Sequence, residues 1–229
     1  MNQGQTSGAW ADTAAEHCLP VAHRVGMLGG AFDPPHHAHR ELAEAALTQL
    51  GLDVLHILPT GQAWHKARPL SQAEHRLAMC DLAFGDLLKT RIDARETRRS
   101  GPTYTVDTLA ELAEEYPGAE LFVVMGADQL LAFKRWVRWE DVLKMATLAV
   151  AQRPEPASVT GPQEPGRAAD ISGIDIPFVP LSMPLHTTSA TAIRARSSTA
   201  NGASPDLTRL VSNDVASYIS AHSLYQDPT

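Results

Sequence analysis

The sequence has little cysteine and no excess of positive charge. Its 229 residues include only two cysteines, Cys18 and Cys80, which form no C-x-x-C pair. This scarcity argues against a disulfide framework or a zinc ribbon, and it fits a protein of the reducing cytoplasm. The formal net charge of −7 gives no bulk basic field for nucleic acid. A phosphate-bearing substrate would therefore have to bind at a local cluster of donors.

Long apolar runs at the start of the chain and internal repeats are also absent. Residues 1–23 carry Asp12 and Glu16 and contain no apolar run, so they predict a disordered leader rather than a signal peptide or a transmembrane helix. We expect residues 24–229 to form one domain, with a small helical part over residues 184–229.

Strand patterns alternate with helix patterns along the rest of the chain. Capping residues mark two helix starts, Asp33 before Pro34-Pro35 and Ser71 in a capping-box pattern with Glu74. The alternation predicts an α/β fold, a Rossmann-like parallel sheet with helices on both faces, whose ligands bind beyond the carboxyl ends of the strands. Strands are predicted over residues 24–32, 53–59, 90–96, 121–125, 147–151 and 174–181, helices over 33–50, 71–84, 105–116, 139–145, 188–196 and 207–222, and a loop over 153–173.

The end of the first predicted strand has the features of a phosphate site. Gly29 and Gly30 let the backbone approach an anion closely, and the amides of a helix start favour negative charge. The dinucleotide motif G-x-G-x-x-G and the P-loop motif are both missing. Instead, His36 and His39 share one face of the following helix, where ring N–H groups can donate to a phosphoryl oxygen.

These histidines have two other interpretations. A single histidine near a helix start more often caps the helix or faces solvent. A zinc site built from His36, His37 and His39 is disfavoured, because no cysteine lies nearby and three ligands so close in sequence would need unusual geometry. The double glycine and the paired histidines together favour phosphate binding.

The segment from Gly29 to His39 resembles the GG-[ST]-F-D-P-x-H-x-G-H signature of the class-I-tRNA-synthetase-like nucleotidyltransferases. The resemblance implies that the two histidines bind the nucleotide triphosphate and stabilise the departing pyrophosphate. Two residues depart from the signature, Ala31 in place of Thr or Ser and Ala38 in place of Gly. Losing one hydrogen bond to a charged group costs roughly 1.5–3 kcal/mol, which predicts lowered activity. The implied ATP-binding residues in this segment are Gly29, Gly30, Ala31, Phe32, His36 and His39.

A second segment, residues 187–194, resembles the I-S-x-T-x-I-R motif of the same superfamily. The hydroxyls of Ser189 and Thr191 suit a phosphate cradle, and Arg194 can hold a phosphate as a bidentate clamp. Alone, a Ser/Thr-rich stretch is more often a helix cap, but the first motif favours the phosphate interpretation. Mg²⁺ held mainly by substrate phosphates is expected.

Further segments resemble bacterial nicotinate-mononucleotide adenylyltransferases, from about Arg24 to Tyr225. Residues 102–109 are similar to P-S-Y-T-x-D-T-L, residues 126–136 to I-G-x-D…W, residues 224–225 to the L-Y near the C-terminus, and His65-Lys66 to P-P-H-[KR], although residues 61–64 depart from it. The acceptor-binding residues that this resemblance implies are His65, Lys66, Tyr104, Thr105, Gly126, Asp128 and Trp136.

The chemistry of these residues suits a pyridine mononucleotide. Trp136 can stack on the nicotinate ring, the amides at Tyr104-Thr105 can bind its carboxylate, and Asp128 suits ribose hydroxyls. His65-Lys66 suits the phosphate. Each also has a plainer interpretation: a core tryptophan, a helix-capping aspartate and a solvated loop.

The sequence therefore predicts a cytoplasmic enzyme of NAD biosynthesis. It would transfer the adenylyl group of ATP to nicotinate mononucleotide, giving nicotinate adenine dinucleotide and pyrophosphate. The alternatives are a sister adenylyltransferase that acts on phosphopantetheine or nicotinamide mononucleotide, and a non-catalytic nucleotide-binding regulator, which Ala31 and Ala38 would suit. The preference between the two pyridine mononucleotides and the oligomeric state, a homo-oligomer included, stay open at this point.

Overall fold

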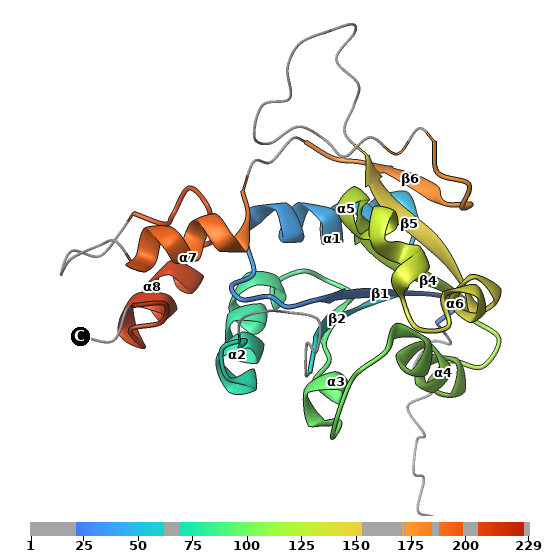
Figure 1. Cartoon of the computed structure of the whole chain (residues 1–229), viewed down its shortest axis with the longest axis horizontal. Coiled ribbons are helices and arrows are strands. Elements are labelled where there is room, and N and C mark those ends of the chain that lie inside the picture. Colours follow the sequence, from blue (N-terminus) through green and yellow to red (C-terminus); the bar gives the residue numbers. More distant parts are fainter. Residues whose placement is uncertain are drawn as a thin grey trace, which may run out of the picture.

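A computed structural model of the chain describes residues 22–61, 69–152, 171, 173–184, 188–198 and 206–226. Its centre is a parallel sheet in the order β3-β2-β1-β4-β5-β6 (Figure 1). The strands are β1 (Arg24–Gly30), β2 (Val54–Pro59), β3 (Thr90–Ile92), β4 (Glu120–Gly126), β5 (Ala146–Gln152) and β6 (Val179–Ser182). This arrangement confirms the predicted Rossmann-like α/β class.

Helices pack on both faces of the sheet. They are α1 (His37–Gln49), α2 (Ala73–Phe84), α3 (Arg95–Arg98), α4 (Thr105–Glu115), α5 (Ala127–Ala132), the 3-10 helix η1 (Phe133–Arg135), α6 (Trp139–Met145), α7 (Ala190–Ser198) and α8 (Asn213–Ala221). Among the described residues, no helix has the length and apolar character needed to cross a membrane.

The alternation of side chains along β4 separates two cores. Phe122 and Val124 pack with residues of α1, α2 and α8 on one face of the sheet. Leu121 and Val123 pack with residues of α4 and α6 on the other face. A strand buried on both faces needs a continuous apolar run, and for this reason β4 was the clearest strand in the sequence.

The strand order reverses direction between β1 and β4. From β1 the chain proceeds outward through β2 and β3, and then it returns to β4 on the other side of β1. Leu28 of β1 is paired with Val124 of β4, so the two strands end side by side. In open parallel sheets a ligand crevice lies at this reversal, beyond the carboxyl ends of the strands. The predicted phosphate turn and Gly126 both follow these two strands.

Two predicted helix starts were wrong. Helix α1 begins at His37, with His36 as its N-cap, because the Asp33 carboxylate is buried and accepts hydrogen bonds from other segments. Helix α2 has Gln72 as its N-cap and no side-chain cap. The Ser71 backbone instead donates to Asp33 and accepts from Arg76, so it is committed to tertiary contacts.

Other boundaries also differ from the predicted ones. The strand predicted to reach Glu96 ends at Ile92, because the Asp93 carboxylate accepts the N–H of Arg95, where α3 begins. The last strand covers only Val179–Ser182, and α8 begins after Ser212, whose hydroxyl accepts the Val215 N–H. The predicted leader and the predicted loop over 153–173 lie outside the described residues, except for residues 22, 23, 171 and 173.

Candidate active site

The turn after β1 combines an open glycine with a buried aromatic anchor. A Cβ added to Gly29 would meet nothing within 4 Å, so a ligand can approach the backbone there. Phe32 is 1% exposed, has a φ of +45°, and packs edge-on against Phe84 with ring centroids 5.7 Å apart. The Thr60 N–H donates to the Gly30 carbonyl at 2.8 Å. Phe32 and the bond from Thr60 therefore fix the turn, while the backbone at Gly29 stays open to a ligand.

His36 and His39 lie together at the start of α1. Their rings stack with centroids 3.7 Å apart, and the Phe32 ring meets His39 edge-on at 5.0 Å. The Nδ1 atom of His39 accepts the His36 backbone N–H at 3.3 Å. A neutral His39 must then carry its proton on Nε2, which makes Nε2 the donor.

The electrostatics of α1 favour a bound anion. The first turn of this helix contains no acidic side chain, so nothing within the helix neutralises the positive end of its dipole. His37, between the two stacked histidines, faces elsewhere: its Nε2 lies 3.2 Å from the Thr208 carbonyl oxygen. Within the described part of the chain, no group of three or more His, Cys, Asp or Glu residues could hold a metal ion.

Arg194 joins the two predicted phosphate segments. Its Nη1 donates to the Asp33 carbonyl at 2.7 Å, across 161 residues of sequence, and its Nη2 donates to the Thr191 hydroxyl at 3.1 Å. The Ser189 hydroxyl accepts the Ala192 N–H at 3.2 Å and so caps α7. Figure 1 shows α7 beside the chain that links β1 to α1. The structure thus brings both segments to one place.

Two buried polar side chains support this turn, Asp33 and Arg76, and the sequence did not predict this role for either of them. Asp33 is 1% exposed, and its carboxylate accepts the Tyr225 hydroxyl at 2.8 Å and the Ser71 N–H at 3.3 Å. Arg76 is 3% exposed and donates to the carbonyl oxygens of Ala31 and Thr60 at 3.1 and 2.8 Å. Burial lowers the pKa of Arg76, and the charge of Asp33 opposes that shift. Arg76 thus links the turn after β1 to the end of β2.

The residues predicted to bind the acceptor follow β4. A Cβ added to Gly126 would lie 2.7 Å from Oδ1 of Asp128, so any larger residue would require that carboxylate to shift. Asp128 is exposed, and it accepts the Gln129 side-chain amide at 2.8 Å. Trp136 is half-buried, with its ring tilted against Phe133 at a centroid distance of 5.2 Å. The exposed carboxylate and the partly covered indole are both accessible to a ligand.

Tyr104 and Thr105 form the start of α4. Tyr104 is the N-cap and Thr105 is the first helical residue, and the cap side chain makes no hydrogen bond to the helix. The N–H groups of a first helical turn have no partner within the helix. Since α4 connects β3 to the parallel strand β4, this end lies on the carboxyl side of the sheet.

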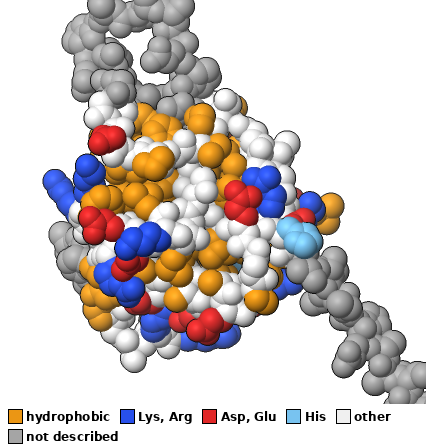
Figure 2. Space-filling model, turned by 90° about the vertical axis from the view of Figure 1, so that its right-hand side faces the viewer, with side chains coloured by type: hydrophobic (Ala, Val, Ile, Leu, Met, Phe, Trp, Pro, Cys, Tyr) orange, Lys and Arg blue, Asp and Glu red, His pale blue; other side chains and the backbone are white. Residues whose placement is uncertain are grey.

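The two predicted halves of the site lie on opposite faces of the sheet. Tyr104, Ala127 and Trp136 pack against the core under α4 and α6, whereas Phe32 belongs to the other core. The predicted ATP-binding and acceptor-binding residues therefore lie on either side of the carboxyl ends of β1 and β4. His65 and Lys66 lie outside the described residues. The face drawn in Figure 2 shows basic and acidic side chains next to one another and no broad patch of one sign.

The parallel sheet and the two predicted phosphate segments are typical of a class of nucleotide-binding proteins. A comparison with family models identifies the family. A model described as cytidylyltransferase-like matches residues 27–196, so the chain belongs to this family. Curated relatives narrow the class. A protein of Albidiferax ferrireducens is 46% identical over 204 residues, which cover 89% of this chain and 98% of the relative. A protein of Methylibium petroleiphilum is 36% identical over 205 residues, which cover 90% and 93%.

Both relatives are named "Probable nicotinate-nucleotide adenylyltransferase", and the chain belongs to that group within the family. Solved structures share the fold. The Plasmodium falciparum nicotinic acid mononucleotide adenylyltransferase complexed with APC superposes with a TM-score of 0.70 at 16% identity, over 89% of this chain and 97% of that chain. Its complex with NaAD also gives 0.70, at 18% identity, over 88% and 97%. The family predicted from the sequence motifs is confirmed.

Proposed function

We propose that this protein transfers the adenylyl group of ATP to nicotinate mononucleotide, giving nicotinate adenine dinucleotide and pyrophosphate. The observation that carries the proposal is the bond from Arg194 to Asp33, since it joins the second phosphate segment to the turn that holds His36 and His39. The names of the relatives supply the acceptor.

The ATP half of the proposed reaction needs donors and no protein nucleophile. A phosphate oxygen of the acceptor attacks the α-phosphorus of ATP, and the bond to the bridging oxygen of pyrophosphate breaks. The Nε2–H of His39, the start of α1 and Arg194 then stabilise the charge that grows on the leaving group. His36 stacks on His39 and fixes the plane of its ring.

The acceptor half would bind the pyridine mononucleotide through three segments. Trp136 would stack on the ring, the first amides of α4 at Tyr104-Thr105 would take the carboxylate, and Asp128 would accept the ribose hydroxyls. His65-Lys66 would meet the mononucleotide phosphate. The half-buried indole, the uncapped start of α4 and the exposed carboxylate support these roles.

The donors around the phosphate turn also bear on the metal. Imidazole N–H, guanidinium and amide groups suit phosphate oxygens and not a hard cation. We therefore propose that Mg²⁺ is held mainly by the substrate phosphates, where it would neutralise charge on the triphosphate. The residues around the turn would align that triphosphate. We place the enzyme in the cytoplasm, which the shortage of cysteine supports.

Pyrophosphate release provides the direct test. Purified protein with ATP and Mg²⁺ is given nicotinate mononucleotide, nicotinamide mononucleotide or phosphopantetheine in separate reactions. We expect the highest kcat/KM with nicotinate mononucleotide. Turnover of phosphopantetheine alone would identify a sister enzyme instead. ATP binding without pyrophosphate release from any acceptor would indicate a regulator and would overturn the enzymatic proposal.

A further inference from the structure

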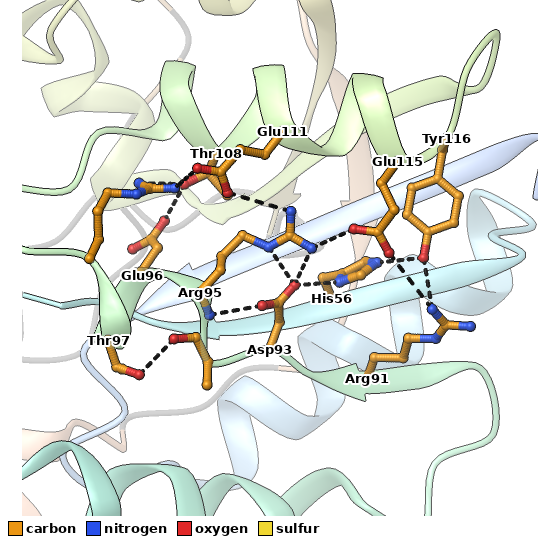
Figure 3. Close-up of polar contacts among 12 residues, drawn as sticks. His56, Arg91, Asp93, Arg95, Glu96, Thr97, Thr108, Glu111, Glu115 and Tyr116 are labelled. Carbon is orange, nitrogen blue, oxygen red and sulfur yellow. Dashed lines mark hydrogen bonds and ion pairs between the residues drawn. The ribbon is translucent and has the colours of Figure 1, made fainter.

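A buried hydrogen bond ties α3 to the start of α4. Glu96 is 5% exposed, and its Oε1 accepts the Thr108 hydroxyl at 2.9 Å (Figure 3). Thr108 is 0% exposed and is the fourth residue of α4. Its oxygen also accepts Nη1 of Arg99 at 3.3 Å. The hydroxyl thus both donates and accepts, which fixes its rotation.

The backbone of Glu96 also lies close to the loop that leads into α4. A Cβ added to Gly61 would overlap the Glu96 carbonyl oxygen and would lie 3.0 Å from Cγ2 of Thr103. The chain after β2, α3 and the loop before Tyr104 are therefore in van der Waals contact. A shift of Glu96 would move the loop from which the first amides of α4 extend.

Ion pairs extend the contact along one face of α4. Thr108, Glu111 and Glu115 follow one another at helical spacing, and Glu111 and Glu115 accept from Arg99 and Arg95 respectively. Figure 3 shows Arg95 beside this row. Arg99 meets Glu111 at 2.6 Å and Arg95 meets Glu115 at 2.6 Å. The two glutamates are 45% and 39% exposed, so their pairs contribute little. The buried bond at the start of α4 is the stronger constraint on its position.

Burial raises the pKa of the Glu96 carboxyl, and the Thr108 hydroxyl and the Arg99 charge offset only part of this shift. The bond from Thr108 does not depend on ionisation, because an oxygen of either form of the carboxyl can accept the hydroxyl.

We infer that Glu96 is a positioning residue for acceptor recognition: through Thr108 it holds the first amides of α4 where a nicotinate carboxylate can bind. This inference rests on the proposed function. The two mononucleotides differ at one group, carboxylate against amide, so a displaced amide donor changes the choice between them. A displacement of about 1 Å is enough to cost large factors in rate.

The test compares Glu96→Gln and Thr108→Val with wild type. For each protein, kcat/KM is measured for nicotinate and for nicotinamide mononucleotide, together with KM for ATP. We expect both variants to lower the nicotinate-to-nicotinamide ratio by about 10-fold, with KM for ATP within about twofold of wild type. Thr108→Ser keeps the hydroxyl and should restore the ratio. The exposed Glu114 on the same helix gives the control, Glu114→Gln, which should match wild type.

The outcomes separate the inference from the proposed function. If wild type prefers nicotinate mononucleotide and both variants keep its ratio, Glu96 does not position the amides. If the variants raise KM for nicotinate and for nicotinamide mononucleotide by the same factor and have a lowered Tm, Glu96 has only a structural role. That result would also overturn the inference. If wild type itself releases no pyrophosphate with nicotinate mononucleotide, the proposed function fails first and the inference falls with it.

Discussion

The tautomer of a neutral His39 is set by a backbone N–H at the start of its own helix. Because Nδ1 accepts the His36 N–H, the neutral ring carries its proton on Nε2. His37 is chemically identical, yet its ring meets the Thr208 carbonyl. Position within one helical turn thus separates a histidine that can meet a substrate from one that meets the protein.

His39→Ala should lower kcat by roughly 10²-fold or more, because it removes the donor that we propose acts on the transition state. His37→Ala is the matched control, since it removes an imidazole from the adjacent position and should leave kcat within about threefold of wild type, the loss of one surface-exposed hydrogen bond being small. Steady-state pyrophosphate release measures both. A near-normal rate in His39→Ala would remove this residue from the mechanism.

Ala31 offers a gain of function. The family signature has a hydroxyl at this position, and the half-buried Ala31 already has its carbonyl bound by Arg76. Ala31→Thr should add one hydrogen bond to phosphate and raise kcat/KM for ATP by about 10-fold, at the lower end of the energy of such bonds. Ala38→Gly restores the other signature residue but adds no donor, so it should only lower Tm. Equal kcat/KM for ATP in wild type and Ala31→Thr would mean that the added hydroxyl does not contact a phosphate of ATP.

The sequence predicted residues that act through local spacing. Gly29, His36 and Arg194 stand in recognisable patterns, and the structure brings their segments together. Arg76 and Tyr225 could not be predicted as supports of the turn. They meet it from 45 and 192 residues away, and no local pattern encodes such contacts.

At the scale of elements, burial decided what the sequence could predict. Helix α6 and strands β1, β2, β4 and β5 were predicted to within a residue or two of their observed limits. Helix α5 was missed because six residues with one buried side chain, Leu130, give no periodicity. Asp33 was misjudged because a buried carboxylate and a helix cap look alike in sequence.

The contact between β3, β2 and α3 predicts an acid-sensitive element. Asp93 accepts His56 Nδ1 and Arg95 Nε at 2.8 and 2.7 Å (Figure 3). Burial alone would raise the pKa of the Asp93 carboxyl, but the hydrogen bonds from His56 and Arg95 outweigh it and lower the pKa to about 2. A lowered pKa means that the carboxylate stabilises the fold at neutral pH and loses this effect as the pH falls.

Asp93→Asn should therefore reduce the free energy of unfolding by about 2 kcal/mol at pH 7, from the shift of its pKa. The difference from wild type should persist down to about pH 4 and then shrink towards pH 2, because the unfolded chain takes up the proton first. Urea unfolding across this range measures it. Asp141, a partly exposed carboxylate paired with the exposed Lys144, gives the control Asp141→Asn, which should change the free energy of unfolding little. A constant difference from pH 7 to pH 2 would contradict the assignment.

At the scale of the whole molecule, the last helix belongs to the central core. Val211, Val215 and Ile219 pack into the same core as β4 and α1. Just beyond α8, Tyr225 donates to Asp33 beneath the phosphate turn. The final helical segment is thus part of the support of the first motif.

Tyr225→Phe tests this link with the loss of a single oxygen. Breaking a bond to a charged group costs roughly 1.5–3 kcal/mol, so Tm at pH 7 should fall by about 3–10 °C. Burial and the charge of Asp33 raise the pKa of this phenol. Its stabilisation is therefore complete below the unfolded pKa of about 10 and is lost above it, so the two proteins should converge in alkaline buffer. Tyr218→Phe, whose hydroxyl contacts His75, is the control and should lower Tm less.

The bond between Tyr225 and Asp33 also concerns the timing of synthesis. The two residues are 192 positions apart. At about 5–20 residues per second, a ribosome needs roughly 10–40 s to travel between them. The turn that contains Asp33 is synthesised early. Arg194 and Tyr225, which contact Asp33 in the folded protein, are added only later. A nascent chain therefore carries the motif before these two residues have been synthesised.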